Sequence, residues 1–174
     1  MGKIIVAGSS NIDMTAYVKT LPRPGETIGN GRFLQANGGK GANQAVAAAR
    51  LGGDVVFLTC VGDDMQGRML KEVFASDGIH TEYMKFSSTS PTGTALIFVA
   101  DDGENCIAVA PGANGELLPG DIDEVAALLF GEREHGLGGT EGVDQVMGKL
   151  RLVAEEGVER DGAHQGEEVL VHFS

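Results

Sequence analysis

Cysteine is scarce in this sequence, which argues against a disulfide framework and a cysteine-based metal site. The two cysteines, Cys60 and Cys106, lie far apart, with no Cys-x-x-Cys pair and no adjacent histidine at ligand spacing. Disulfide-rich domains and zinc modules need cysteine pairs at short, fixed spacings. We therefore predict two reduced thiols in the core or in strands of a cytoplasmic protein.

Basic residues and long apolar runs are also few. The 13 lysines and arginines are outnumbered by 25 aspartates and glutamates, which gives a formal net charge of -12. Nucleic acids and anionic membranes attract basic surfaces, so neither is an expected partner. No stretch is long enough for a transmembrane helix, and the apolar start at residues 3–7 is too short for a signal peptide. A cytoplasmic protein that handles a small molecule fits these absences.

Strand-like and helix-like segments alternate along much of the chain. Residues 3–7 and 54–61 are apolar runs typical of strands buried on both faces. Residues 42–51 are rich in alanine, and residues 65–74 carry apolar side chains at the spacing of an amphipathic helix. A third helix is expected from about residue 122 to 130, with Asp121 as its N-cap. This alternation predicts an α/β fold with a parallel sheet and flanking helices, in one domain.

Two β-rich stretches interrupt the alternation. The first, residues 14–35, has strand-like pieces at 14–18, 27–28 and 32–34, separated by prolines and glycines. The second has strands at 92–100 and 106–110, joined by turn residues typical of a hairpin. We interpret both as excursions from the α/β core that form a small β lid.

The most informative string is Gly38-Gly39-Lys40-Gly41-Ala42-Asn43-Gln44, a glycine-rich turn that runs into a helix. The first amides of a helix are free to bind an oxygen-rich ligand, and glycines let backbone approach it closely. The string is not a phosphate-binding P-loop, because Gly41 occupies the position of its serine or threonine. A tight strand-to-helix connection without a ligand is the alternative, although Asn43 on an apolar helix needs a polar partner.

A second polar group follows the first strand, where Asn11 and Asp13 point to one side and Ile12 to the other. Ligands of α/β proteins bind at the carboxyl ends of parallel strands. A carboxylate accepts hydrogen bonds and an amide donates and accepts them, which suits a pair of sugar hydroxyls. A structural turn is the alternative for this string. Asp63 and Asp64, after the second strand, are interpreted as helix caps rather than catalytic groups.

Six strings are informative together: residues 4–13, Pro24-Gly25-Glu26-Thr27, Gly38 to Ala45, Val61-Gly62-Asp63-Asp64, Pro91-Thr92-Gly93-Thr94-Ala95 and Pro111-Gly112-Ala113-Asn114. In order and spacing they resemble the amino-terminal half of the ribokinase-type PfkB carbohydrate kinases. Lys40-Gly41 within the glycine turn resembles ribokinases rather than the fructokinase or adenosine kinase branches. The resemblance covers about residues 3–125, so residues 1–125 are expected to form a sugar-binding portion with its lid.

The resemblance implies an activity and a site. Such kinases transfer phosphate from ATP to a sugar, so we expect D-ribose as substrate, ribose 5-phosphate as product, and Mg²⁺ and a monovalent cation such as K⁺ as cofactors. A homodimer through the β lid is also implied. The lid residues over the sugar would be Ala95 and Ile97. The sugar contacts carried over by position are Asn11, Ile12, Asp13, Gly39, Lys40, Gly41, Ala42 and Asn43.

The catalytic half of the family pattern has no counterpart in the sequence. The Gly-Ala-Gly-Asp string, which supplies the family's anion hole and catalytic base, is missing, as are the Asn-x-x-Glu motif and the ATP-binding elements. Residues 126–174 do not resemble the family and are interpreted as a weakly ordered tail, produced by a shifted reading frame that begins within residues 126–130. Three interpretations stay open: a ribose kinase, a non-catalytic truncated fragment with a sugar-binding or dimerising surface, and an incomplete product with an unpaired sheet edge.

Overall fold

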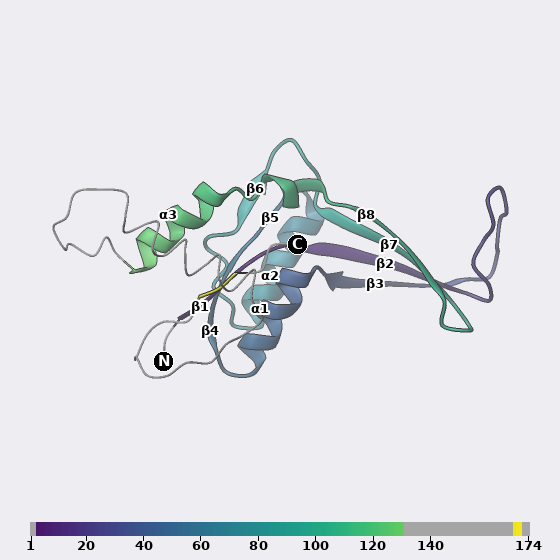
Figure 1. The fold of residues 1–174 in the computed structure, drawn as a ribbon, viewed down its shortest axis with the longest axis horizontal. Coiled ribbons are helices and arrows are strands. Elements are labelled where there is room, and N and C mark those ends of the chain that lie inside the picture. The colour runs from purple at the N-terminus through teal and green to yellow at the C-terminus, as the bar shows by residue number, and fades with distance from the viewer. Residues whose placement is uncertain (1–2, 131–168, 172–174) are drawn as a thin grey trace.

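The computed structural model describes residues 3–130 and 169–171, and in them an α/β core carries a separate, projecting β-sheet (Figure 1). Three helices flank the core sheet: α1 (Lys40–Arg50), α2 (Met65–Ser76) and α3 (Pro119–Phe130). The predicted α/β class is therefore confirmed. The core sheet is parallel and has the strand order β4 (Asp54–Leu58), β1 (Lys3–Ala7) and β9 (Val169–Val171).

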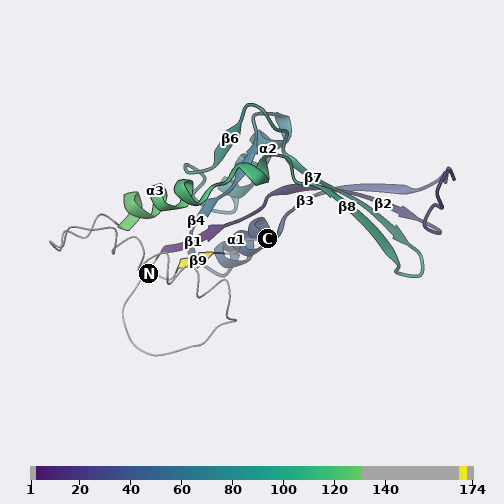
Figure 2. The ribbon, with the colours of Figure 1, turned by 45° about the horizontal axis from the view of Figure 1, so that its top comes forward.

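Both faces of the core sheet are covered, as the uninterrupted apolar runs predict. Val6, Val55 and Phe57 face α1 and α2, and the ring of Phe57 meets that of Phe74 edge to face at a centroid distance of 5.3 Å. Helices α1 and α3 lie on opposite sides of β1 (Figure 2). The alternate side chains of the sheet pack against α3 in a second cluster, formed by Ile5, Ala7, Val56, Leu58, Ile122 and Val125.

The projecting sheet has the strand order β3-β2-β7-β8 and extends away from the core (Figure 1). The predicted hairpin is present as β7 (Gly93–Ala100) and β8 (Asn105–Ala110). β2 (Asn11–Val18) pairs in parallel with β7 and antiparallel with β3 (Arg32–Gly38), so both strands are longer than predicted. The prediction of a strand at residues 27–28 is wrong. The pairing of β2 with β3 ends at residues 17 and 32, so residues 27–28 lie in the loop that connects these two strands.

A change of partner splits the predicted strand at residues 54–61. β4 ends at Leu58, whose carbonyl accepts a hydrogen bond from the amide of Gly8 (3.0 Å). The chain continues as β5 (Cys60–Gly62), which pairs in parallel with β6 (Lys85–Ser87) in a separate two-stranded sheet. The apolar run is continuous in the sequence because both pieces are buried, although they belong to different sheets.

Helix α3 begins at Pro119, ahead of its predicted start. Proline suits the first helical position because the N–H that it lacks would have no partner there. Asp121 is therefore not the N-cap. It lies in the first turn, where its carboxylate accepts a hydrogen bond from the amide of Leu118 (2.8 Å). The same carboxylate binds the ammonium group of Lys85 (2.9 Å), which ties the start of α3 to β6.

Both cysteines are free thiols, as predicted. Cys60 is buried in β5 and Cys106 is exposed in β8.

Part of the predicted tail belongs to the core. The segment 126–174 contributes the end of α3 and the strand β9, which pairs with residues 5–7 of β1. The rest of that segment, on which the prediction of weak order falls, lies outside the described residues. Among the helices that the structure describes, none has the length and apolar character of a membrane span.

Candidate functional site

The register of the projecting sheet puts four predicted site residues on one face. β2 pairs in parallel with β7, and Asp13 lies opposite Ala95. Side chains two positions apart in a strand point to the same face, so Asn11 and Asp13 share a face with Ala95 and Ile97. Ile12 points the other way and is fully buried in the core. Only backbone atoms of Ile12 are therefore available to a ligand on this face.

The glycine turn between β3 and α1 packs directly on the loop that follows β1. A side-chain carbon on Gly41 would lie 2.7 Å from the backbone of Gly8, and one on Gly39 would lie 2.5 Å from the carbonyl oxygen of Ser9. Gly39 also has a φ of 98°, which residues with a side chain rarely adopt. The amide of Ala42 donates to the Ser9 carbonyl (3.1 Å). The two polar strings that the sequence singles out are therefore in contact.

The start of α1 keeps backbone donors available beside this contact. The amide of Asn43 donates to the carbonyl of Gly39 (2.9 Å). The amides of Lys40 and Gly41 meet no acceptor within the described part of the chain, and the side chain of Lys40 is exposed. The side chain of Ala42 is buried in the core, which leaves only its backbone near the turn. Free amides and a lysine suit an oxygen-rich ligand.

Asp13 holds its carboxylate against the glycine turn. A side-chain carbon on Gly38 would overlap this carboxylate, so glycine is needed to make room for it. No residue that the structure describes donates a hydrogen bond to Asp13, and burial raises the pKa of its carboxyl above the ordinary value. A partly buried carboxylate without a partner costs free energy of folding. Such groups are concentrated in ligand and active sites.

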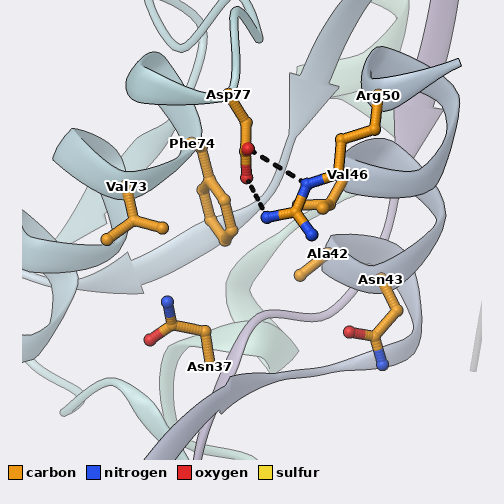
Figure 3. Close-up of a pocket in the computed structure, with 8 residues that line it drawn as sticks. All are labelled: Asn37, Ala42, Asn43, Val46, Arg50, Val73, Phe74 and Asp77. Carbon is orange, nitrogen blue, oxygen red and sulfur yellow. Dashed lines mark hydrogen bonds and ion pairs between the residues drawn. The ribbon is translucent and has the colours of Figure 1, made fainter.

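Asn43 is not joined to Asn11 or Asp13 by a hydrogen bond. Its side chain is exposed and lines the groove between α1 and α2 together with Asn37 (Figure 3). Asn37 pairs with Ile12, so it lies on the face of the projecting sheet opposite to Asp13. The ion pair between Arg50 and Asp77 crosses this groove. The other residues that line the groove are Ala42, Val46, Val73 and Phe74.

Sequence reasoning missed Asn114, which contacts the site from the 3₁₀ turn η1 (Gly112–Glu116). Its side-chain amide donates to Oδ1 of Asn11 (2.8 Å) and to the carbonyl of Ser10 (3.1 Å). It also accepts a hydrogen bond from the amide of Ser10 (2.8 Å). The only sequence signal for this role is the string Pro111-Gly112-Ala113-Asn114, which carries part of the family resemblance.

The predicted capping role is correct for Asp64 and wrong for Asp63. Asp64 accepts hydrogen bonds from the amide of Gly67 (2.8 Å) at the start of α2, and from the amide and hydroxyl of Thr92 (2.8 and 2.7 Å). Burial raises the pKa of Asp64, but these hydrogen bonds outweigh burial and hold the pKa below its ordinary value. Asp63 forms an exposed ion pair with Arg68 (2.8 Å). Asp64 therefore joins α2 to the start of β7.

The described residues do not supply a place for Mg²⁺. Within residues 3–130 and 169–171, no group of three or more His, Cys, Asp or Glu side chains could hold a metal ion. The Gly-Ala-Gly-Asp and Asn-x-x-Glu strings, which the resemblance associates with ATP and magnesium, are absent from the sequence. We therefore derive no step of phosphate transfer from these residues.

Comparison with known proteins decides the family. The model of the pfkB family of carbohydrate kinases matches residues 1–135. The chain belongs to this family. The match continues past residue 125, where we expected the resemblance to end, and includes all of α3.

Individual family members place the similarity among the ribokinases and their relatives. A ribokinase from Haemophilus influenzae is 46% identical over 114 residues, which are 66% of this chain and 37% of that protein. A deoxyribokinase from Salmonella typhi is 42% identical over 126 residues, 72% of this chain and 41% of the relative. The structure of Arabidopsis thaliana ribokinase complexed with ribose and ATP has a TM-score of 0.59 and 34% identity, and covers 65% of this chain and 37% of that one. The chain spans about two fifths of the length of these proteins.

Proposed function

We propose that residues 1–125 are the sugar-binding portion of a ribokinase-type kinase and that they bind D-ribose. The observation that carries the proposal is the Asp13 carboxylate, which is partly buried beside the glycine turn and receives no hydrogen bond from the described residues. A sugar hydroxyl would supply the missing donor. Asn11 lies on the same face of β2 and would bind the same or the neighbouring hydroxyl.

The other predicted residues have supporting roles in this proposal. The free amides of Lys40 and Gly41 would donate to a further sugar oxygen, and Gly39 would let the sugar approach the backbone. Asn43 is included as a sugar contact by its place in the family pattern alone, because its side chain lines the groove between α1 and α2. The apolar side chains of Ala95 and Ile97 would cover the sugar as parts of a lid. Ile12 and Ala42 would contribute backbone only.

For the corresponding complete kinase we propose ATP-dependent phosphorylation of D-ribose to ribose 5-phosphate. The similarity to ribokinases over residues 1–135 supports this reaction. ATP, Mg²⁺ and a monovalent cation such as K⁺ are its proposed cofactors. We also propose that the reading frame shifts, but beyond the predicted residues 126–130, because the family match continues to residue 135. Translation of the gene in its other two frames tests this, because a kinase-like carboxyl-terminal half should appear downstream.

Isothermal titration with D-ribose tests the sugar site. We expect binding with a Kd of about 1 mM or lower. We expect 2-deoxy-D-ribose to bind about tenfold more weakly, because a missing hydroxyl leaves a polar group of the site unpaired. The comparison is informative because the chain is similar to both a ribokinase and a deoxyribokinase. Absence of binding heat with ribose at several times this concentration would exclude the proposed site.

A second candidate function is dimerisation through the projecting sheet, and exposed apolar side chains favour it. Phe33 is 62% exposed and Ile107 is 54% exposed, and the register puts them on opposite faces of the sheet. We expect the wild-type chain to sediment as a dimer, and either Phe33→Glu or Ile107→Lys to dissociate it, depending on which face is covered. Leu51→Lys is the control, because Leu51 is 89% exposed on the core, away from this sheet. A wild-type monomer at high protein concentration would exclude this function.

A further inference from the structure

Asn114 makes four hydrogen bonds with its one side-chain amide. Its Oδ1 accepts from the amide of Ser10 (2.8 Å). Its Nδ2 faces three acceptors, which share its two protons: the Ser10 carbonyl (3.1 Å), the Pro111 carbonyl (2.9 Å) and Oδ1 of Asn11 (2.8 Å). These partners allow one orientation of the amide. Exchange of the oxygen and nitrogen of Asn114 would turn its oxygen toward two carbonyls and its nitrogen toward an N–H.

The fixed amide of Asn114 also fixes the amide of Asn11. Nδ2 of Asn114 is a donor, so the atom of Asn11 that faces it must be the oxygen. The nitrogen of Asn11 is then on the other branch of its planar amide, and no described residue accepts a hydrogen bond from it. Asn11 therefore presents a donor to a ligand, whereas the neighbouring Asp13 carboxylate presents an acceptor.

Gly93 leaves the space that this amide pair needs. A side-chain carbon at Gly93 would overlap both Oδ1 of Asn11 and Nδ2 of Asn114. Gly93 is the first residue of β7 and pairs with Asn11 in the sheet. The hydrogen bond between the two amides thus depends on a glycine from a third segment of the chain.

We propose that Asn114 is a positioning residue, which turns the side-chain nitrogen of Asn11 toward the sugar so that Asn11 donates to a hydroxyl oxygen while Asp13 accepts a hydroxyl proton. The inference rests on the proposed sugar site and adds to it a direction for each hydrogen bond. A hydroxyl group is both donor and acceptor, so one such pair of contacts is complementary to a sugar and not to an ether or a simple alkyl group.

The variant Asn114→Asp tests the direction of these contacts. It preserves the shape of the side chain and the hydrogen bond from the Ser10 amide, but it replaces the donor that faces Asn11 and the carbonyls of Ser10 and Pro111 with an acceptor. We expect ribose affinity, measured by isothermal titration, to fall on the order of tenfold. The same substitution made in an Asn11→Ala background should have almost no further effect on ribose affinity. An equal loss in both backgrounds would overturn the proposal, because Asn114 would then act through the fold and not through Asn11.

A second variant covers the case in which Asn114→Asp does not fold. Asn11→Asp retains the oxygen that accepts from Asn114 and replaces only the nitrogen that is offered to the ligand. We expect it to retain the wild-type fold by circular dichroism and to lose about tenfold or more in ribose affinity. Ribose binding as tight as that of the wild-type chain would show that the nitrogen of Asn11 does not donate, and the proposal would fail.

Side-chain amide NMR separates a failure of this inference from a failure of the sugar site itself. If the wild-type chain does not bind ribose, the proposed function is wrong, but the orientation of Asn11 is still measurable in the free protein. The Nδ2 protons of Asn11 should exchange rapidly with water in the wild type. They should become protected in Asn114→Asp, where the Asn11 amide turns to donate to the new carboxylate. In that case unchanged exchange in the variant would refute the positioning role.

Discussion

Replacing Asp13 with asparagine is expected to weaken ribose binding strongly and at the same time to raise the thermal midpoint of the free protein. The carboxylate is partly buried without a donor, and this burial raises its pKa. The folded chain therefore bears a desolvation cost that a neutral amide would reduce. The sugar would lose a charged acceptor, which corresponds to a decrease in affinity of about 100-fold. Titration calorimetry and thermal unfolding followed by circular dichroism measure the two effects on the same sample.

The pH dependence provides a control for this result. An acid with a raised pKa in the folded state binds its proton more tightly there than in the unfolded chain. Asp13 therefore destabilises the fold at neutral pH, and the stability difference from Asp13→Asn should shrink as the pH falls through the raised pKa. Ribose affinity should fall over the same range, because protonation removes the negative charge of the acceptor. Asp63→Asn, which removes an exposed ion pair, should change neither property. An Asp13→Asn variant that binds ribose normally would contradict the assignment.

Local patterns were sufficient to predict the core but not the points at which strands change partners. The apolar run at residues 3–7 and the alternation of strands with helices correctly predicted a sheet buried on both faces. The run at residues 54–61 predicts one strand because burial continues through Thr59. In the structure, β4 pairs with β1 and β5 pairs with β6. Apolar periodicity measures burial, and it cannot show which neighbour accepts the backbone hydrogen bonds.

The candidate site shows the same limit. Asn11, Asp13 and the glycine turn can be nominated from the sequence because a turn and a strand end are visible within a few residues. Asn114 was not found as part of the site, because its contact with Asn11 spans 103 residues and is made by a side chain in a short 3₁₀ turn. Ile12 and Ala42 were included by position in the family pattern, and the structure buries both side chains in the core. Long-range contacts of this kind depend on tertiary packing and have no local signature.

Replacing Gly41 with alanine is expected to destabilise the fold. Among the glycines of the turn that have an ordinary φ, Gly41 should give the largest effect. The added carbon would lie 2.7 Å from the backbone of Gly8 and 2.9 Å from the amide nitrogen of Ser9. Backbone cannot rotate away as a side chain can, so α1 and the loop after β1 must separate. We expect a decrease of about 2–3 kcal/mol in the free energy of unfolding, measured by urea denaturation, and loss of any ribose binding.

Two other glycines make the test specific for this contact. The three atoms nearest to the added carbon of Gly38→Ala all belong to the Asp13 carboxylate, which can rotate, so we expect this variant to weaken ribose binding with a smaller effect on the free energy of unfolding. Gly120→Ala, in the first turn of α3, meets no atom within 4 Å and should be neutral or stabilising by about 0.5–1 kcal/mol. If Gly41→Ala unfolded at the same urea concentration as Gly120→Ala, the close contact between the two loops would not exist. The ligand face would then lack the support on which both Asp13 and the α1 amides depend, because that contact brings the two strings together.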